Sequence, residues 1–304
     1  MGSSWNSVVG SLTSVLLADP TLGDVALDTS LPSEWKTRAE RLRALPGDQG
    51  RFCLVRLAGS LSWLFAHDPT WTETAVLSPM EMAGEIRDAA LAGFFGNANI
   101  HGALFARIKA LLLSLSSEEG PARQRYEVQL ASLCITAWYQ KNASGQRLLS
   151  DEELRAVLVH CSVPMRTRIL WHAQQFSIAE KLALLRDVWP LQLAARSAIV
   201  AGRLCMMTFG DDEHFPELVD AILPLVSPGD GVGIMVPPPS ASVRQIFERY
   251  PEHVLALLWA VLPIDPSKWP YGMDAILQQL WKQSTRTRKD SRMVELMRRI
   301  GRGP

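Results

Sequence analysis

His160, Cys161 and His172 are the side chains in this sequence that suggest metal or nucleophilic chemistry. Zinc needs nitrogen and sulfur ligands that converge on one point, and a catalytic Cys–His pair needs direct contact. Neighbouring positions on a helix point about 100° apart, so His160 and Cys161 do not converge on one ion. A hydrolase would also need histidine and carboxylate side chains to meet in one cleft. We therefore expect core or boundary roles for these residues, and no catalytic site.

A second candidate is the glycine series Gly229-x-Gly231-x-Gly233, which resembles a fragment of a nucleotide-binding loop. Phosphate binding by such a loop requires a preceding strand, a following helix and a closing lysine or third glycine. None of these is present, so we predict no nucleotide or other cofactor. The surrounding segment 227–240 is expected to be a Pro/Gly-rich loop, and long loops on helical scaffolds often carry contact sites. Its candidate partner-binding residues are Pro237, Pro238 and Pro239.

The acidic run Asp211-Asp212-Glu213-His214 has the composition of a weak cation site. It lies directly before Phe215-Pro216-Glu217, where a helix is expected to begin. Negative charge is stabilising at a helix N-terminus because the unpaired N–H groups there carry partial positive charge. We favour this capping role and predict no metal site.

The last thirty residues contain a cluster of basic side chains. Such a cluster can hold phosphate groups, but no aromatic residues are interleaved to stack on bases, and a solvated terminal helix that packs on a partner has the same composition. Nucleic-acid binding is therefore the alternative function, not the favoured one. The candidate partner-binding residues are Arg286, Arg288, Lys289, Arg298, Arg299 and Arg302.

Composition limits the remaining classes of function. The chain has 304 residues, 47% of them hydrophobic, and its acidic and basic residues balance at 31 each. A balanced charge provides no global field that would attract nucleic acid or an anionic membrane. No apolar run is long enough to span a bilayer, and the N-terminus has no pattern of a signal peptide. The four cysteines are widely spaced in apolar surroundings, which indicates buried thiols in a reducing cytoplasm.

Helical periodicity dominates the chain, and strict strand-like alternation is nearly absent. The stretch from Phe215 is echoed thirty-five positions later from Tyr250, each copy reading aromatic-Pro-Glu-x-Val-x-Ala-aliphatic-Leu. Proline and glutamate fit the first turn of a helix, and a repeat of this length is typical of stacked helical units. We predict an all-α fold, an α-solenoid-like (HEAT-like) array of stacked helix pairs, with parts 1–145 and 146–304 continuous with each other.

Local signals place individual helix boundaries. The segment from Trp5 to Leu17 is apolar at helical spacing, and the turn-rich stretch from Gly93 to Gly102 is expected to interrupt the helices. Ser150 followed by Glu153 predicts a capping box.

Several boundary motifs together resemble the C-terminal helical region of large bacterial proteins that carry an N-terminal sirtuin-like domain. They are Trp189-Pro190-Leu191, the segment His214 to Leu225, Tyr250-Pro251-Glu252, Trp269-Pro270-Tyr271 and His67-Asp68-Pro69-x-Trp71 within the segment from Arg51 to Leu77. In that family the sirtuin-like part consumes NAD in anti-phage defence, and the helical part is implied to sense a trigger or to hold the assembly together. This sequence has no strand-rich segment that matches the enzymatic part, so the resemblance implies no catalytic residue here.

We therefore expect a non-enzymatic, cytoplasmic interaction module, the sensing or scaffolding part of a bacterial anti-phage defence protein. Its expected partner is another protein or an attached effector domain, with no membrane contact. The alternative remains a helical domain that binds nucleic acid through the basic C-terminal cluster.

Overall fold

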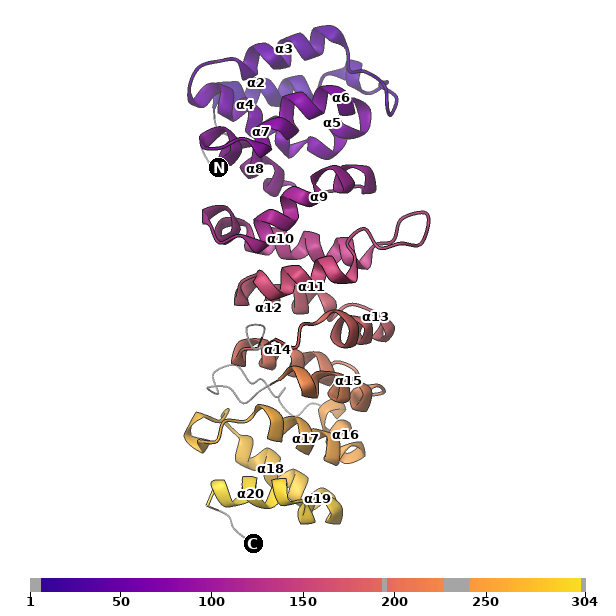
Figure 1. Cartoon of the computed structure of the whole chain (residues 1–304), viewed down its shortest axis with the longest axis vertical. Helices are drawn as coiled ribbons and strands as arrows, with labels where there is room; N and C mark the ends of the chain where they lie inside the picture. The colour runs from indigo at the N-terminus through magenta and orange to yellow at the C-terminus, as the bar shows by residue number, and fades with distance from the viewer. Residues whose placement is uncertain (1–6, 193–195, 227–240, 302–304) are drawn as a thin grey trace. The chain divides into compact units, whose positions relative to one another are not determined.

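The computed structural model describes residues 7–192, 196–226 and 241–301 and is all-α, as the sequence predicts, with no β-strand among these residues (Figure 1). The described residues fall into two compact units. The first runs to Leu115 and includes Glu119–Gln129 and Asn142–Leu148. The second comprises Ser116–Glu118, Leu130–Lys141 and the chain from Leu149 onward. The predicted boundary at 145/146 lies within the region where the chain passes between them.

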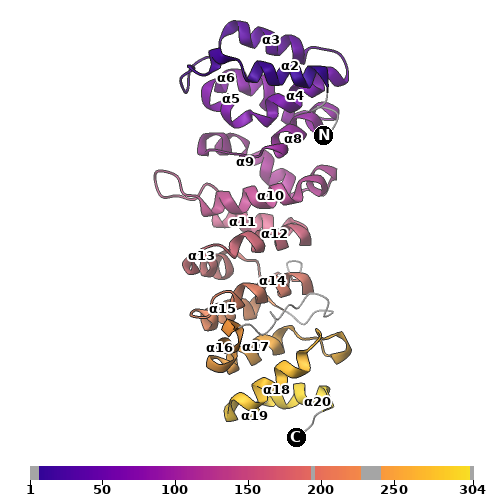
Figure 2. The same ribbon diagram turned by 180° about the vertical axis from the view of Figure 1, so that it is seen from behind.

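The first unit contains a series of short helices. They are α2 (Val8–Leu17), η1 (Pro20–Leu22), α3 (Ser33–Arg43), α4 (Asp48–Gly59), α5 (Leu61–His67), α6 (Pro69–Thr72), the π-helical η2 (Glu73–Leu77), α7 (Ser78–Glu81), α8 (Glu85–Gly96) and α9 (Gly102–Ser117). Helix α4 packs against α2, α3 and α8, and both views show it between α2 and α8 (Figures 1 and 2). Helix α10 (Pro121–Tyr139) has a break at Tyr126 and continues into the second unit.

The helices of the second unit follow one another in chain order (Figures 1 and 2). They are α11 (Asp151–His160), α12 (Val163–Ala173), α13 (Ile178–Ala183), the π-helical η3 (Leu184–Val188), α14 (Ala198–Phe209), α15 (Phe215–Ile222), η5 (Leu223–Leu225), α16 (Ala241–Arg249), α17 (Pro251–Val261), η6 (Pro266–Lys268), α18 (Met273–Gln283), α19 (Thr285–Lys289) and α20 (Ser291–Arg299). The predicted capping box is confirmed at the start of α11, where Ser150 Oγ accepts from the N–H of Glu153.

The two echoed sequences form neighbouring helices of the second unit. Helices α15 and α17 both carry proline in the first turn, as their sequences predict. The aromatic rings that begin the two copies, Phe215 and Tyr250, stack with centroids 6.1 Å apart. The repeat in sequence therefore corresponds to two helix starts whose first aromatic rings stack on each other.

All four cysteines are buried free thiols, as their apolar surroundings predict. Burial raises the pKa of Cys134 to about 11 and that of Cys205 to about 12. Both side chains are therefore protonated at neutral pH and behave as small core residues. None of the described helices has both the length and the apolar character needed to cross a bilayer.

The predicted interruption between Gly93 and Gly102 is wrong in its first part, because α8 continues to Gly96. Gly93 lies inside that helix where α8 approaches α4 closely. A Cβ atom on Gly93 would stand 2.8 Å from Ala58 Cβ and closer still to the Val55 carbonyl oxygen. Glycine is present here because two helix backbones come into contact, and not because the chain turns.

We predict that Gly93→Ala destabilises the protein by about 1–3 kcal/mol, because the added methyl group forces α4 and α8 apart. The matched control is Gly102→Ala in the first turn of α9, where the nearest atom to an added Cβ is Leu148 Cδ2 at 3.8 Å. Alanine at that position removes chain entropy without a clash, so the control variant is at least as stable as the wild type. Urea unfolding followed by circular dichroism measures the unfolding free energy of both variants. Equal stability of the two variants would contradict the close packing.

Candidate functional site

Helix α2 exposes an aliphatic ridge on the surface of the first unit. The helix has no charged residue in its sequence VVGSLTSVLL. Its inner face is buried at Val9 and Leu16, whereas Val8, Leu12 and Val15 on the other face are 76%, 50% and 71% exposed. Ser11 is exposed on the same face, so this surface is aliphatic apart from one hydroxyl group. The exposed ridge is therefore a candidate contact surface.

A groove of about 680 Å³ lies beside this ridge, between α2 and α3. Its walls are mainly apolar. The aliphatic and proline residues that line it are Leu12, Val15, Leu16, Pro20, Leu42 and Leu45. Concave apolar surfaces of this size, bordered by a few polar groups, are typical of binding sites.

Charged side chains border the groove along α3. The guanidinium of Arg38 lies 3.2 Å from Glu34 and 3.8 Å from Asp19, measured to the nearest carboxylate oxygens. Arg41 is exposed at the rim and forms no ion pair with any carboxylate in the described part of the chain. The groove thus has an apolar interior and a rim with charges of both signs.

The inner face of α3 fixes this helix against its neighbours. Trp35 is 1% exposed, and its indole N–H donates to the carbonyl oxygen of Leu16 on α2 at 2.7 Å. The Trp35 ring meets Trp71 edge to face, with centroids 5.3 Å apart, and the Trp71 indole N–H donates to Glu40 at 3.0 Å. These contacts hold α3 beside α2 and α6, so they set the position of the groove wall.

A further hydrogen bond holds α3 at its C-terminal end. Pro79 has no N–H, so it cannot donate to the carbonyl of Ala75 four residues before it. The guanidinium of Arg43 donates to that carbonyl at 2.9 Å. Helix α3 is therefore attached at its C-terminal end to the π-helical segment η2.

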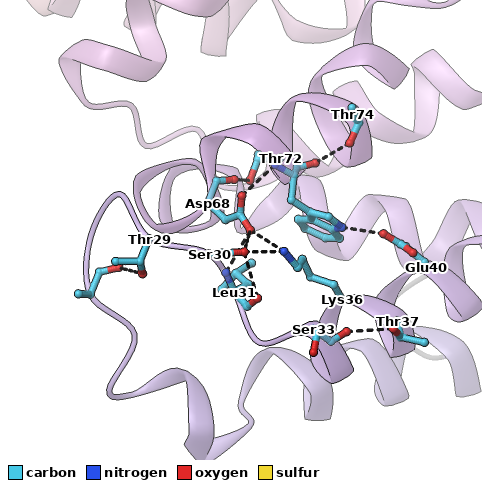
Figure 3. Close-up of polar contacts among 12 residues, drawn as sticks. Thr29, Ser30, Leu31, Ser33, Lys36, Thr37, Glu40, Asp68, Thr72 and Thr74 are labelled. Carbon is cyan, nitrogen blue, oxygen red and sulfur yellow. Dashed lines mark hydrogen bonds and ion pairs between the residues drawn. The ribbon is translucent and has the colours of Figure 1, made fainter.

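The buried carboxylate of Asp68 connects the start of α6 to the loop before α3 and to α3 itself (Figure 3). Asp68 is 4% exposed. One carboxylate oxygen accepts from the N–H of Trp71 at 2.9 Å and caps α6. The other accepts from the N–H of Leu31 at 3.0 Å and from the hydroxyl of Ser30 and the ammonium of Lys36, both at 3.2 Å.

The pKa of Asp68 reflects this arrangement. Burial by itself raises the pKa, but the N–H groups of Trp71 and Leu31 and the ammonium of Lys36 together outweigh burial and hold it below its ordinary value. The ionised form is thus the form that the fold selects. The charge of Asp68 therefore helps to hold the loop and α3 in place.

The three candidate side chains, His160, Cys161 and His172, have separate surroundings. His160 is exposed at the end of α11, whereas Cys161 is buried. His172 on α12 lies 2.7 Å from the Ser132 hydroxyl of α10, and burial and the nearby Arg168 lower its pKa. No group of three metal-ligating side chains converges anywhere in the described ranges. The Ser132–His172 contact is therefore a neutral hydrogen bond between packed helices.

The acidic run before α15 acts locally. The carboxylate of Asp211 accepts from the backbone N–H of His214 at 3.1 Å and contacts the imidazole nitrogen of the same residue at 3.0 Å. The hydrogen bond with Asp211 raises the pKa of His214. Asp211 therefore holds the residue that precedes α15, and no side chain caps the helix itself, so the predicted capping role stays a prediction.

The basic C-terminal residues are largely paired with carboxylates. Arg286 lies 3.1 Å from Glu252, and Arg298 and Arg299 lie 2.8 and 3.0 Å from Glu295. Hydrogen bonds from Arg298 and Arg299 lower the pKa of Glu295 to about 2. Arg288 donates to the carbonyl oxygen of Trp281 at 3.2 Å. Arg302 and Pro237, Pro238 and Pro239 lie outside the described residues.

Comparison with known proteins gives no match to a family model, and none to a curated protein or a solved structure.

The groove was not predicted from the sequence, although one signal for it is visible there. The ten residues of α2 include no charge, which is unusual for a helix on a protein surface. The other wall, on α3, depends on tertiary contacts that no local pattern reveals.

We predict that Asp68→Asn destabilises the protein by about 2–4 kcal/mol at neutral pH. The variant removes the charge that pairs with Lys36, and its amide NH2 group cannot accept the hydrogen bonds that Leu31 and Lys36 donate. The pKa of Asp68 is lowered in the folded state, so its contribution is complete above the unfolded pKa of about 4 and is lost as pH falls through the folded pKa. The difference in unfolding free energy between Asp68→Asn and wild type therefore becomes smaller as the pH falls below about 4.

Urea unfolding at a series of pH values measures this difference. The matched control is Asp265→Asn, which alters another Asp-Pro helix start, where an exposed carboxylate accepts from the N–H of Ser267 at 2.9 Å. Asparagine is an equally good N-cap, so the control stays close to wild type. If the difference in unfolding free energy between Asp68→Asn and wild type stays constant across the acid range, Asp68 is not ionised in the folded protein.

Proposed function

We propose that this chain is a non-enzymatic helical interaction module and that the groove between α2 and α3 is its principal binding surface. The observation that carries the proposal is the uncharged helix α2, which exposes Val8, Leu12 and Val15 beside an apolar groove. Covering such a surface removes apolar area from water, at about 25 cal/mol per Å². A polypeptide segment with aliphatic side chains is the ligand that fits this chemistry.

The helical-repeat architecture is part of the same proposal. The successive helices of the second unit and the stacking of the two echoed helix starts support an α-solenoid-like array. Each helical repeat in such an array contacts chiefly the neighbouring repeats, and arrays of this kind provide extended surfaces for other proteins.

The biological setting that we propose is bacterial anti-phage defence in the cytoplasm. Support comes from the resemblance of the motifs around Trp189-Pro190, Phe215-Pro216 and Tyr250-Pro251 to the helical region of sirtuin-associated defence proteins. In this setting the chain senses a trigger or holds an assembly together, and it contacts a protein partner or an attached effector domain.

Phage challenge of a bacterial strain that encodes the chain tests this function. We expect deletion of the gene to raise the plating efficiency of at least one phage. The double variant Leu12→Asp/Val15→Asp should fail to restore protection, because it places two charges on the apolar ridge. Ile264→Asp, at an aliphatic residue that is 77% exposed outside the groove, should restore it. Full protection by the double variant would refute a role for the groove.

Nucleic-acid binding remains the second candidate, and one observation favours it. Arg288 and the adjacent Lys289 are exposed at the end of α19, and neither forms an ion pair with a carboxylate within the described ranges. The ion pairs of Arg286, Arg298 and Arg299 count against a larger phosphate-binding surface. We therefore rank this function below protein binding.

If the chain binds nucleic acid, its affinity for a short fluorescent DNA duplex falls steeply with salt. Arg288→Ala/Lys289→Ala then reduces the slope of log K against log salt concentration by about two. Arg298→Ala/Arg299→Ala changes the slope less, because the carboxylate of Glu295 already offsets one of their two positive charges. Fluorescence anisotropy measures both variants. Absence of binding by the wild type at low salt would eliminate this candidate.

A further inference from the structure

We propose that helices α12 and α14 of the second unit form a further interaction surface, which binds an acidic segment of a partner protein that carries aliphatic side chains beside its carboxylates. We call it the α12–α14 surface. It consists of Arg168 and Trp171 on α12 and of Ile199, Arg203 and Met206 on α14. The α2–α3 groove belongs to the first unit, so this inference goes beyond the proposed function and does not depend on it.

Each of the two helices contributes an accessible stripe. Ile199, Arg203 and Met206 follow one another at spacings of four and three residues, so they share one face of α14 between buried neighbours. Arg168 and Trp171 lie one turn apart on α12. The two helices pack against each other, and both views show them on one side of the second unit, with α13 and α15 on the other (Figures 1 and 2). The two stripes are therefore neighbouring parts of one surface.

The guanidinium of Arg168 is held in place by an aromatic ring. Trp171 is 44% exposed, and the guanidinium carbon of Arg168 lies 4.1 Å from the centroid of its ring. The Nε atom of Arg168 is buried and has no hydrogen-bond partner in the described part of the chain. Stacking fixes the plane of the guanidinium, and a fixed planar group binds a carboxylate through two parallel hydrogen bonds at small cost in entropy. The pair is therefore preorganised for a carboxylate.

The charges of the two helices favour an acidic ligand. Neither α12 nor α14 contains an aspartate or a glutamate. Arg166 is buried and donates to carbonyl oxygens of α11, whereas Arg168 and Arg203 form no ion pair with any carboxylate that the structure describes. Complementary charge steers association and suppresses wrong partners. A surface with two such arginines and no carboxylate is therefore complementary to a negatively charged segment.

Apolar side chains accompany the two arginines and narrow the class of ligand. Ile199 is 53% exposed, and Met206 on the same stripe is an adaptable apolar contact. Tryptophan and arginine are the residues most enriched among those that dominate binding energy at protein interfaces. Nucleic acid would offer little to the aliphatic side chains, and two arginines neutralise few phosphates. An acidic protein segment with aliphatic residues matches both the charge and the apolar contacts.

Selection from a random peptide library on the immobilised full chain tests this inference. Peptides that bind the wild type but not Arg168→Glu/Arg203→Glu should be enriched in aspartate and glutamate next to aliphatic residues. The matched control is Arg186→Glu, at an exposed arginine of η3, and it should retain the same peptides. If no peptide depends on the two arginines, or if those that do are not acidic, the inference is wrong.

Fluorescence anisotropy of one selected peptide then separates charge from stacking. We expect Trp171→Ala to weaken binding by on the order of tenfold, and Arg168→Lys to weaken it less, because lysine keeps the charge but not the planar group. Arg168→Glu/Arg203→Glu should instead bind a version of the peptide in which lysine replaces every acidic residue. An unfolded variant cannot gain such binding. Failure to bind the lysine version contradicts the proposed complementarity.

Two further measurements distinguish other occupants and the other site. If a single-stranded thymidine oligonucleotide binds in a manner that Arg168→Glu/Arg203→Glu abolishes, and no acidic peptide does, the surface belongs to nucleic acid and the inference is overturned. Leu12→Asp/Val15→Asp should leave the affinity for the selected peptide unchanged. Loss of peptide binding in that variant would place the peptide in the α2–α3 groove and would also overturn the inference.

Discussion

The buried carboxylate of Asp68 is the interaction on which the geometry of the first unit depends. A single ionised group satisfies the start of α6, the backbone of the loop before α3 and the ammonium of Lys36. A buried charge is tolerated only when its neighbours supply enough donors, so these elements must assemble around it together. The loop that joins α2 to α3 has no regular helix of its own near Leu31, and the carboxylate fixes the point at which α3 begins.

Helix α3 connects these buried bonds with the surface groove. Lys36 and Trp35 hold the inner face of the helix, and Arg43 attaches its end to the carbonyl of Ala75. The outer face then forms one wall of the groove at a fixed distance from α2. A binding surface held by buried bonds loses little conformational entropy when a ligand arrives. The groove can therefore be apolar and preformed without being covered by the chain itself.

Local chemistry explains which features could be predicted from the sequence. The capping box at Ser150 and the proline starts of α15 and α17 depend on residues within one turn of a helix, so their patterns were sufficient. Gly93 was misinterpreted because glycine signals either a turn or a close approach of backbones, and only the position of α4 distinguishes them. The ion pair of Arg286 could not be predicted from a local pattern, because its partner Glu252 lies far from it in sequence.

The two faces of α3 separate stability from binding. Its inner face carries the hydrogen bonds and ring contacts that fix the fold. Glu34, Arg38 and Arg41 on the outer face are exposed, and Arg38 pairs with Glu34. Exposed ion pairs contribute little to stability, so the outer stripe can change its sequence of charges at small cost to the fold. The outer stripe can therefore border a binding surface without carrying the fold, while Asp68 and Trp35 keep the helix in place.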